Sequence, residues 1–185
     1  WHAASGAEGS ADASWTPWSS ALDADAAPFY RWFVDGQTNA CFNLLDRHVL
    51  SGRGKNQALV FEGDRWDPSK NEGRGGPVFE QHLSYRELLV EVALRARVLK
   101  SLDLSAGDRI ALNLPNILEQ IFYILAAQRL GVIYTPVFGG FSAKTLSDRI
   151  HDAGAKVVIT ADGGYRNAEV VPYKSTYTDP ALDNY

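Results

Sequence analysis

The sequence of 185 residues contains a single cysteine, Cys41, and no methionine. One cysteine cannot form an internal disulfide, so the chain does not require an oxidising compartment, and we expect a cytoplasmic protein. The longest apolar run, residues 121–127, is far shorter than the roughly 20 residues that cross a bilayer, and no secretory signal is visible. We therefore expect no membrane partner. Because the chain starts at Trp1 and lacks an initiator methionine, we expect a piece of something longer.

Basic residues are missing from the start of the chain. Residues 1–30 contain four acidic residues and no lysine or arginine, which leaves 18 acidic and 18 basic residues in the remainder. The net charge of −4 therefore belongs to the terminus, and the rest of the chain is neutral. Surfaces that bind nucleic acid need a clear cationic excess, so DNA and RNA are not expected partners.

Residues 1–28 are rich in alanine, serine, glycine and aspartate and have no sustained apolar period. This composition predicts an acidic tail or linker. Trp15 and Trp18 also fit a linker with a docking point, since two indoles three residues apart usually pack on a surface.

The sequence of residues 29–82 predicts an irregular N-terminal region that packs on a larger body. Asn43 is expected to start a helix with Leu44 and Leu45 on one side. A short strand is predicted at residues 57–62, followed by an exposed loop of turn-forming and charged residues at 66–77.

Residues 83–185 alternate regularly between helix and strand patterns. A capping box of Ser84 and Glu87 starts the first helix, and Asn116 and Ser142 are expected to cap the next two. Strands are predicted at residues 109–114, 132–137 and 156–160. Together with the earlier strand, the order β-α-β-α-β-α-β predicts an α/β fold with a parallel sheet covered by helices. No element is predicted after Asp162.

Two glycine pairs follow predicted strands, at the edge where ligands bind to open parallel sheets. Gly139-Gly140 leads into the helix at Ser142, whose free amides favour an anion, and Gly163-Gly164 is followed by Arg166, a cation able to bind phosphate. Each pair alone is also typical of a tight strand-to-helix turn. Both interpretations, a nucleotide-like ligand and simple turns, stay open at this point.

Other signals for chemistry are weak. Neither a dinucleotide-binding G-x-G-x-x-G pattern nor a phosphate-binding G-x-x-x-x-G-K-[ST] pattern occurs. Ser142 has no partner base and is interpreted as a helix cap, and Asp46-Arg47-His48 as a salt-bridged helix surface. The histidines lack metal-ligand spacing; they are His2, His48, His82 and His151. We therefore predict no catalytic residue and no metal ligand within this chain.

An ordered set of motifs nevertheless resembles a known family. The motifs are WFxxG at 32–36, NxLDRH at 43–48, EGD at 62–64, LSYREL at 83–88, GDRIA at 107–111, LAxxRxG at 125–131, VFGGFS at 137–142, RIxD at 149–152 and VITAD at 158–162. From about Phe29 to Leu182 the sequence resembles the N-terminal portion of AMP-forming acyl-CoA synthetases of the acetyl- and propionyl-CoA synthetase type. The block FGGFSAKTLSDRI is specific to this resemblance.

The resemblance implies a ligase that forms an acyl-adenylate from ATP and a short carboxylate with magnesium, and then transfers the acyl group to CoA. It implies that Phe138, Gly139, Gly140 and Arg166 border the site for the nucleotide portion of CoA. Glu169 departs from the basic residue that many relatives have after this arginine, and an acidic group would repel phosphate.

The resemblance further implies an incomplete part of the large N-terminal domain of an adenylate-forming enzyme. The ATP and magnesium sites and the catalytic lysine would lie outside this segment, so the remainder of the same enzyme is an expected partner and the piece alone is expected to be inactive.

Several alternatives stay open. The sequence does not choose between acetate, propionate and 3-hydroxypropionate as the acid. The segments around Tyr134 and Tyr165 resemble most closely the ligase part of propionyl-CoA synthase fusion enzymes of 3-hydroxypropionate metabolism. A rival hypothesis from another class is a noncatalytic α/β module that binds a nucleotide or docks another chain.

Overall fold

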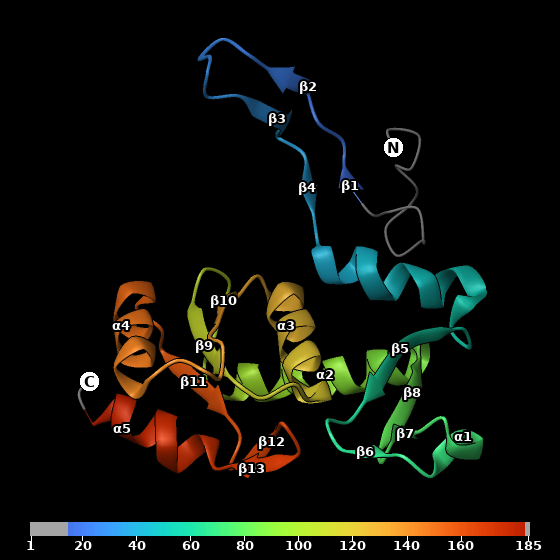
Figure 1. Cartoon of the computed structure of the whole chain (residues 1–185). Helices are drawn as coiled ribbons and strands as arrows, with labels where there is room; N and C mark the ends of the chain where they lie inside the picture. The colour runs from blue at the N-terminus through green and yellow to red at the C-terminus, as the bar shows by residue number, and fades with distance from the viewer. Residues whose placement is uncertain (1–14, 184–185) are drawn as a thin grey trace.

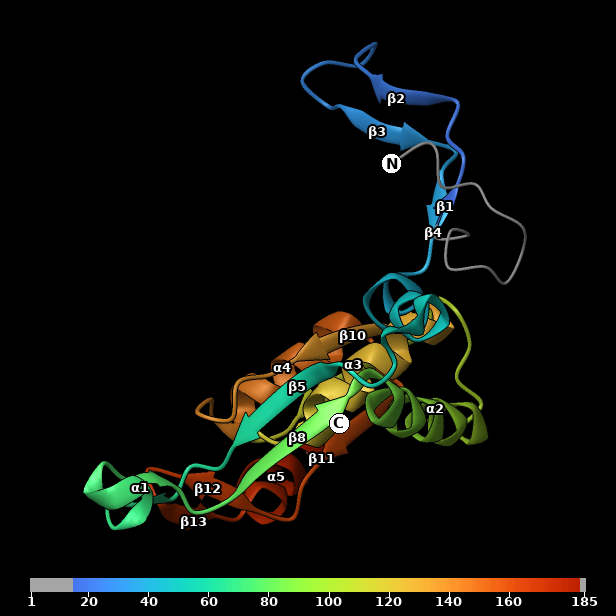
Figure 2. The ribbon, with the colours of Figure 1, turned by 90° about the vertical axis from the view of Figure 1, so that its right-hand side faces the viewer.

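The computed structural model describes residues 15–183, which form a body and a projecting N-terminal arm (Figure 1). The arm comprises two antiparallel strand pairs: β1 (Trp15–Thr16) with β4 (Gln37–Thr38), and β2 (Ser20–Asp23) with β3 (Arg31–Val34). A view turned by 90° shows the same separation of arm and body (Figure 2).

Three aromatic rings hold the arm together. Trp18 lies with its ring centroid 4.9 Å from that of Phe33 and 5.7 Å from that of Trp15, with edge-to-face geometry, which is the favoured arrangement of aromatic pairs. The two indoles thus pack within the arm itself. The predicted tail falls partly on residues 1–14, which lie outside the described residues, and its remainder contains two strands that the sequence pattern missed.

A helical segment joins the arm to the body. It contains the wide-turn helices η2 (Phe42–Asp46) and η3 (Val49–Arg53). Leu45 is fully buried whereas Leu44 is 56% exposed, so the expectation that both lie on one side is wrong. Neighbouring residues on a helix point in directions about 100° apart, and only Leu45 faces the body.

The predicted strand at residues 57–62 is confirmed as β5 (Gln57–Glu62), but it pairs antiparallel with β8 (Glu80–Ser84). It therefore forms a separate ribbon, and the full β-α-β-α-β-α-β pattern is not confirmed. The predicted loop between them contains the pair β6 (Trp66–Asp67) and β7 (Gly76–Pro77) around a single helical turn, α1 (Lys70–Gly73). This loop folds the chain back on itself without a crossover helix, and such a return gives an antiparallel pair.

The centre of the body is a three-stranded parallel sheet of order β10-β9-β11. Its strands are β9 (Arg109–Asn113), β10 (Ile133–Pro136) and β11 (Val157–Thr160), and its helices are α2 (Tyr85–Ser101), α3 (Leu118–Leu130) and α4 (Ala143–Ala153). In β9 the four residues after Arg109 are all buried, as expected for a strand covered on both faces.

The helix ends agree with the predicted caps, with one exception. Ser84 and Glu87 form the capping box of α2, and the Ser142 hydroxyl accepts a hydrogen bond from the Thr145 amide at the start of α4. The predicted cap of α3 by Asn116 is wrong: the N-cap is Ile117, which makes no side-chain cap.

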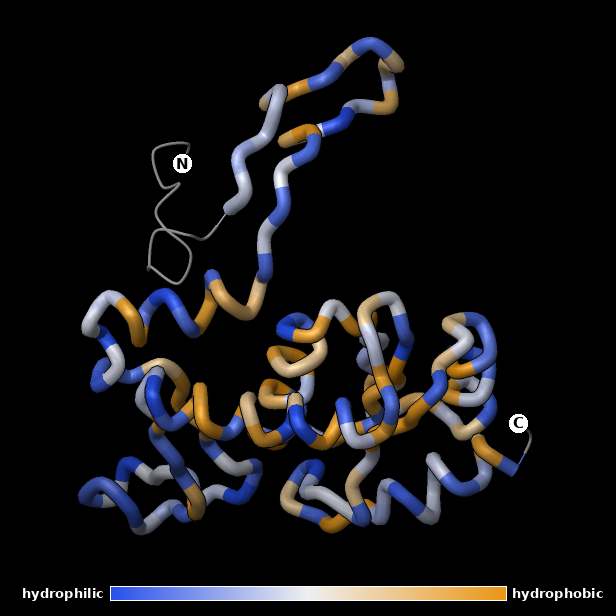
Figure 3. The backbone as a smooth tube through the Cα atoms, turned by 180° about the vertical axis from the view of Figure 1, so that it is seen from behind, coloured by the Kyte–Doolittle hydropathy of each residue, from blue (hydrophilic) through white to orange (hydrophobic). Residues whose placement is uncertain are grey.

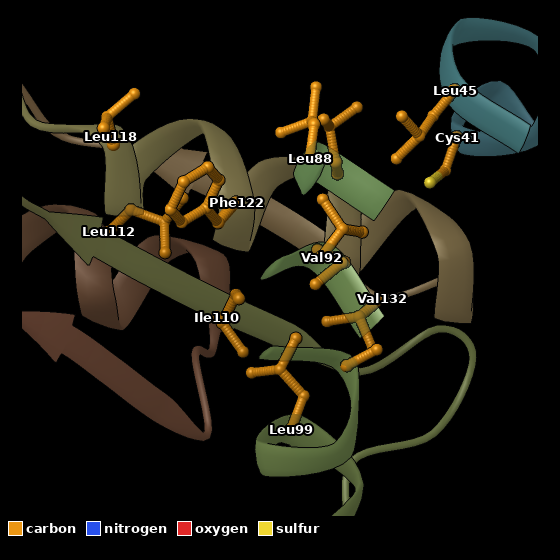
Figure 4. Packing of buried hydrophobic residues seen from close by; sticks show 14 of the residues in the cluster. Cys41, Leu45, Leu88, Val92, Leu99, Ile110, Leu112, Leu118, Phe122 and Val132 are labelled. Carbon is orange, nitrogen blue, oxygen red and sulfur yellow. The ribbon is translucent and has the colours of Figure 1, made fainter. Parts of the chain in front are cut away.

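Two apolar clusters cover the two faces of β9, because successive side chains of a strand alternate. Ile110 and Leu112 belong to a cluster that also contains side chains of α2 and α3 and the buried Leu45 (Figure 4). Ala111 packs with α4 and with α5 (Asp179–Leu182) on the other face. Hydrophobic residues accordingly gather in the middle of the body (Figure 3).

The chain after Asp162 is structured, although no element was predicted there. A hairpin of β12 (Gly164–Arg166) and β13 (Glu169–Val171) precedes the wide-turn helix η4 (Lys174–Thr178) and α5. The buried Asn113 amide donates to the Thr178 hydroxyl over 3.0 Å. This contact ties the C-terminal segment to the end of the central strand.

Candidate functional site

The order of the strands creates a switch point at the carboxyl ends of β9 and β10. From β9 the chain continues into α3 on one face, and from β10 it continues into α4 on the other. The crevice between two such connections is where open α/β sheets bind ligands. A cavity of about 460 Å³ lies here, between the segment 114–116 after β9 and the segment 136–140 around the end of β10.

All four predicted site residues line this cavity, which we call the Arg166 cavity: Phe138, Gly139, Gly140 and Arg166. They come from two elements far apart in the sequence, the loop after β10 and the strand β12. The Arg166 guanidinium lies 5.7 Å from the centre of the Phe138 ring, a cation–π distance. It makes no ion pair within residues 15–183, so it is available to an anionic ligand.

The two glycines after β10 are required by close packing. A Cβ atom at Gly140 would lie 2.6 Å from Phe138 Cε1 and 3.1 Å from Arg166 Nη1, and one at Gly139 would overlap the Tyr173 hydroxyl. The second pair differs from the expectation. Gly164 packs against Pro115, where a Cβ would lie 2.5 Å from Cγ, and leads into a hairpin instead of a helix.

Acidic groups stand close to Arg166. Glu169 is its direct partner in the β12–β13 register and is exposed. Asp64 lines the cavity and accepts a hydrogen bond from the Ala168 amide over 2.5 Å. Because Asn167 and Ala168 both adopt positive φ at the hairpin turn (54° and 63°), this bond helps to fix the turn and the position of Arg166.

Tyr173 is a cavity residue that the sequence analysis missed. It is 4% exposed, lines the Arg166 cavity and packs against Gly139. Burial raises the pKa of its hydroxyl, and the charge of Arg166 opposes that shift. No signal in the sequence pointed to it, since it follows the last predicted element.

The other candidates have structural roles. Asp46 forms an ion pair of 2.6 Å with Arg129 of α3. Burial raises the pKa of Cys41 to about 11, so its thiol stays protonated and is not a nucleophile at neutral pH. Among residues 15–183, no group of three or more His, Cys, Asp or Glu side chains could hold a metal ion. No helix in the same range is long and apolar enough to cross a membrane.

Comparison with known proteins places the chain in a family whose fold agrees with the parallel sheet described above. The family profile of AMP-binding enzymes matches residues 62–183, and that of the acetyl-coenzyme A synthetase N-terminus matches residues 10–44. Within the described residues, the second match spans both strand pairs of the arm and the start of the helical segment.

Several similar proteins are named acetyl-coenzyme A synthetase. That of Methylobacillus flagellatus is 44% identical over 171 residues, which are 92% of this chain and 24% of the relative. That of Mycobacterium tuberculosis is 43% identical over 171 residues, 91% of this chain and 24% of the relative. The chain thus spans about a quarter of the length of the curated relatives it matches. With the family profile covering most of its length, the chain belongs to the AMP-binding enzyme family and resembles the N-terminal portion of the acetyl-coenzyme A synthetase type.

Proposed function

We propose that this chain is the N-terminal segment of a short-chain acyl-CoA ligase, and that the Arg166 cavity binds the nucleotide portion of CoA. The whole enzyme would form an acyl-adenylate and pyrophosphate from ATP and a carboxylate, and the CoA thiol would then displace AMP. One observation carries the proposal: Phe138, Gly139, Gly140 and Arg166 converge on one cavity at the switch point of the parallel sheet.

The chemistry of the cavity suits a phosphorylated ligand. A guanidinium offers planar, charge-assisted hydrogen bonds to phosphate oxygens. The loop that contains Gly139 and Gly140 leads into α4, whose first turn carries the positive end of the helix dipole.

Arg166 is the main cationic contact in the described part of the cavity. Glu169 and Asp64 lie close to it and reduce the positive potential there. A single cation with acidic neighbours favours modest affinity for phosphate. Substitution of Arg166 would therefore remove the main cationic contact of the ligand. We place the ATP and magnesium sites, and the group that catalyses adenylate formation, outside residues 15–183. For this reason the segment alone is expected to be inactive.

The acid substrate is tested with the full-length protein. Acetate, propionate and 3-hydroxypropionate are supplied in turn with ATP, magnesium and CoA, and AMP and acyl-CoA are quantified. AMP and acyl-CoA formed in equal amounts from at least one acid support the ligase. A protein that forms neither with any short carboxylate contradicts it and favours the noncatalytic nucleotide-binding or docking module. A preference for 3-hydroxypropionate would support the similarity to propionyl-CoA synthase.

The role of the cavity is tested by Arg166→Ala in the same assay. Loss of a charge-assisted hydrogen bond raises the KM for CoA on the order of tenfold to a hundredfold, with little change in the KM for ATP. Arg31→Ala is the matched control, because Arg31 lies in the arm and pairs only weakly with Asp23 at 3.7 Å. An unchanged KM for CoA in Arg166→Ala would contradict the assignment of the Arg166 cavity to CoA.

A further inference from the structure

Helix α2 carries apolar side chains on two faces. Its buried residues belong to the core cluster of the body. A second row lies at intervals of four residues and ends directly after the helix, with exposed fractions of 54%, 44%, 42% and 46%: Val90, Leu94, Val98 and Leu102. Because residues four apart on a helix are neighbours on its surface, these side chains form one continuous row. We call this row the α2 stripe.

The α2 stripe lies apart from the candidate site. Figure 2 shows α2 at the margin of the body, away from α4 and α5, and none of its residues lines the Arg166 cavity. The outer face of a surface helix is normally polar, whereas an apolar patch that stays exposed is typical of a contact with another molecule. The stripe is therefore a candidate interaction surface that is separate from ligand binding.

The charges of α2 are divided along its length. Acidic residues lie in the first half and basic residues in the second, apart from Arg86 in the first turn: Glu87, Glu91, Arg95, Arg97 and Lys100. A second copy of α2 that runs in the opposite direction would place its acidic half against the basic half of the first. This charge complementarity favours the antiparallel pair over a parallel one, in which like charges would lie at the same level.

The apolar residues match in the same arrangement. Val90 lies four residues before Leu94, and Val98 lies four residues after it. In an antiparallel pair centred on Leu94, Val90 of one copy is therefore at the level of Val98 of the other, and Leu94 meets its own counterpart. A two-fold interface requires such self-complementarity, because both copies use the same patch.

We propose that the α2 stripe is the docking surface for a second copy of this chain, in an antiparallel pair of α2 helices centred on Leu94. One helix from each copy offers less area than the roughly 1,600 Å² of a standard interface, so we expect a dissociation constant in the micromolar range. This inference goes beyond the proposed function and does not depend on it, since α2 contributes nothing to the lining of the Arg166 cavity.

The test is thiol cross-linking of the full-length protein with a short bismaleimide at tens of micromolar. Leu94→Cys places two thiols next to each other at the two-fold axis. Ser101→Cys, on the same exposed side of α2, is the matched control, because position 101 lies seven residues from the centre and its two thiols would be about 21 Å apart along the helices. The unaltered protein corrects for other cysteines; Cys41 is buried. We expect cross-linked dimer from Leu94→Cys and little from Ser101→Cys.

The outcomes distinguish the possible arrangements. Equal cross-linking of Leu94→Cys and Ser101→Cys would overturn the antiparallel pair, because a parallel pair brings both positions together. No cross-linking of Leu94→Cys would also overturn the proposal. A lower free energy of unfolding in Leu94→Asp would in that case assign the stripe to another segment of the same enzyme.

A second substitution tests whether the stripe itself holds the pair. Val98→Asp, added to Leu94→Cys, places a carboxylate in the apolar row and is expected to lower the yield of cross-linked dimer at least tenfold. Val60→Asp in the same background is the control, because Val60 lies on β5 and is 41% exposed, against 42% for Val98. An equal yield of cross-linked dimer with Val98→Asp and Val60→Asp would overturn the docking surface.

Discussion

The arm and the body are stabilised in different ways. In the body, Leu45, Leu99 and Ile110 are fully buried in one contiguous cluster. In the arm, several large apolar side chains remain accessible, with Phe29 79% and Trp32 64% exposed. The arm is held by strand pairing and a small aromatic cluster, so its contacts are local. The comparison indicates that the free energy of unfolding lies mainly in the body, and that the arm can change without unfolding the site.

The largest expected difference comes from truncating one leucine in each region. Leu99→Ala removes a fully buried side chain and is expected to lower the free energy of unfolding by about 3–5 kcal/mol. Leu22→Ala removes a side chain of the arm that is 43% exposed, with an expected change within about 0.5 kcal/mol. Urea titration monitored by circular dichroism measures both. Equal losses would contradict the division between arm and body.

The junction of the two regions should give a smaller effect. The Asn39 amide donates to the carbonyl oxygens of Gln128 and Arg129 in the last turn of α3, over 3.2 and 3.1 Å. Asn39→Ala removes both hydrogen bonds, and we expect a loss of about 1–2 kcal/mol in the free energy of unfolding. Limited proteolysis is expected to cut the arm faster in this variant. Unchanged proteolysis and stability would show that the arm is fixed by other contacts.

A helix cap in the body should contribute more than a similar hydroxyl in the arm. Ser84→Ala breaks the capping box of α2 and is expected to cost about 1 kcal/mol. Ser20, whose hydroxyl donates to the Leu22 carbonyl in the arm, is the control, and Ser20→Ala is expected to change stability within about 0.5 kcal/mol. Thermal unfolding measures the stability of both variants. A larger loss of stability for Ser20→Ala than for Ser84→Ala would contradict this expectation.

The smallest effect is a pH dependence confined to the body. The hydrogen bond and ion pair from Lys156, together with hydrogen bonds from Ser105, hold the pKa of Asp108 at about 2, below the ordinary value of 3.8. The unfolded chain therefore binds this proton more readily, so the contribution is present above pH 3.8 and is lost as the pH falls to about 2. Urea midpoints across this range should fall less for Asp108→Asn than for the unaltered chain. An equal fall of the urea midpoint with pH in both proteins would contradict the low pKa assigned to Asp108.

The parts of the fold that sequence patterns predicted are those with local causes. Ser84 with Glu87 and Ser142 mark helix starts through their own side chains, and the structure confirms them. The pairing of β5 with β8 depends on how a long loop returns, which no local pattern encodes. The strands of the arm were missed because they are short and only partly buried, so they lack an apolar period.

The candidate site was also predictable only where its residues follow a local pattern. Gly139, Gly140 and Arg166 follow strands whose ends share one edge, and this placement brought them together in the structure. Tyr173, Asp64 and Asn116 come from the start of a helix, a turn and a loop, which tertiary folding brings to the cavity. Their contribution depends on contacts between segments far apart in the chain, so spacing alone could not reveal it.

The most direct test of the central claim is the dissociation constant of CoA for the full-length protein, measured by calorimetry with Arg166→Ala and the arm control Arg31→Ala. The account predicts that Arg166→Ala weakens CoA binding on the order of tenfold or more, whereas Arg31→Ala binds as the unaltered protein does. Equal affinity of all three proteins for CoA would contradict the assignment of the Arg166 cavity.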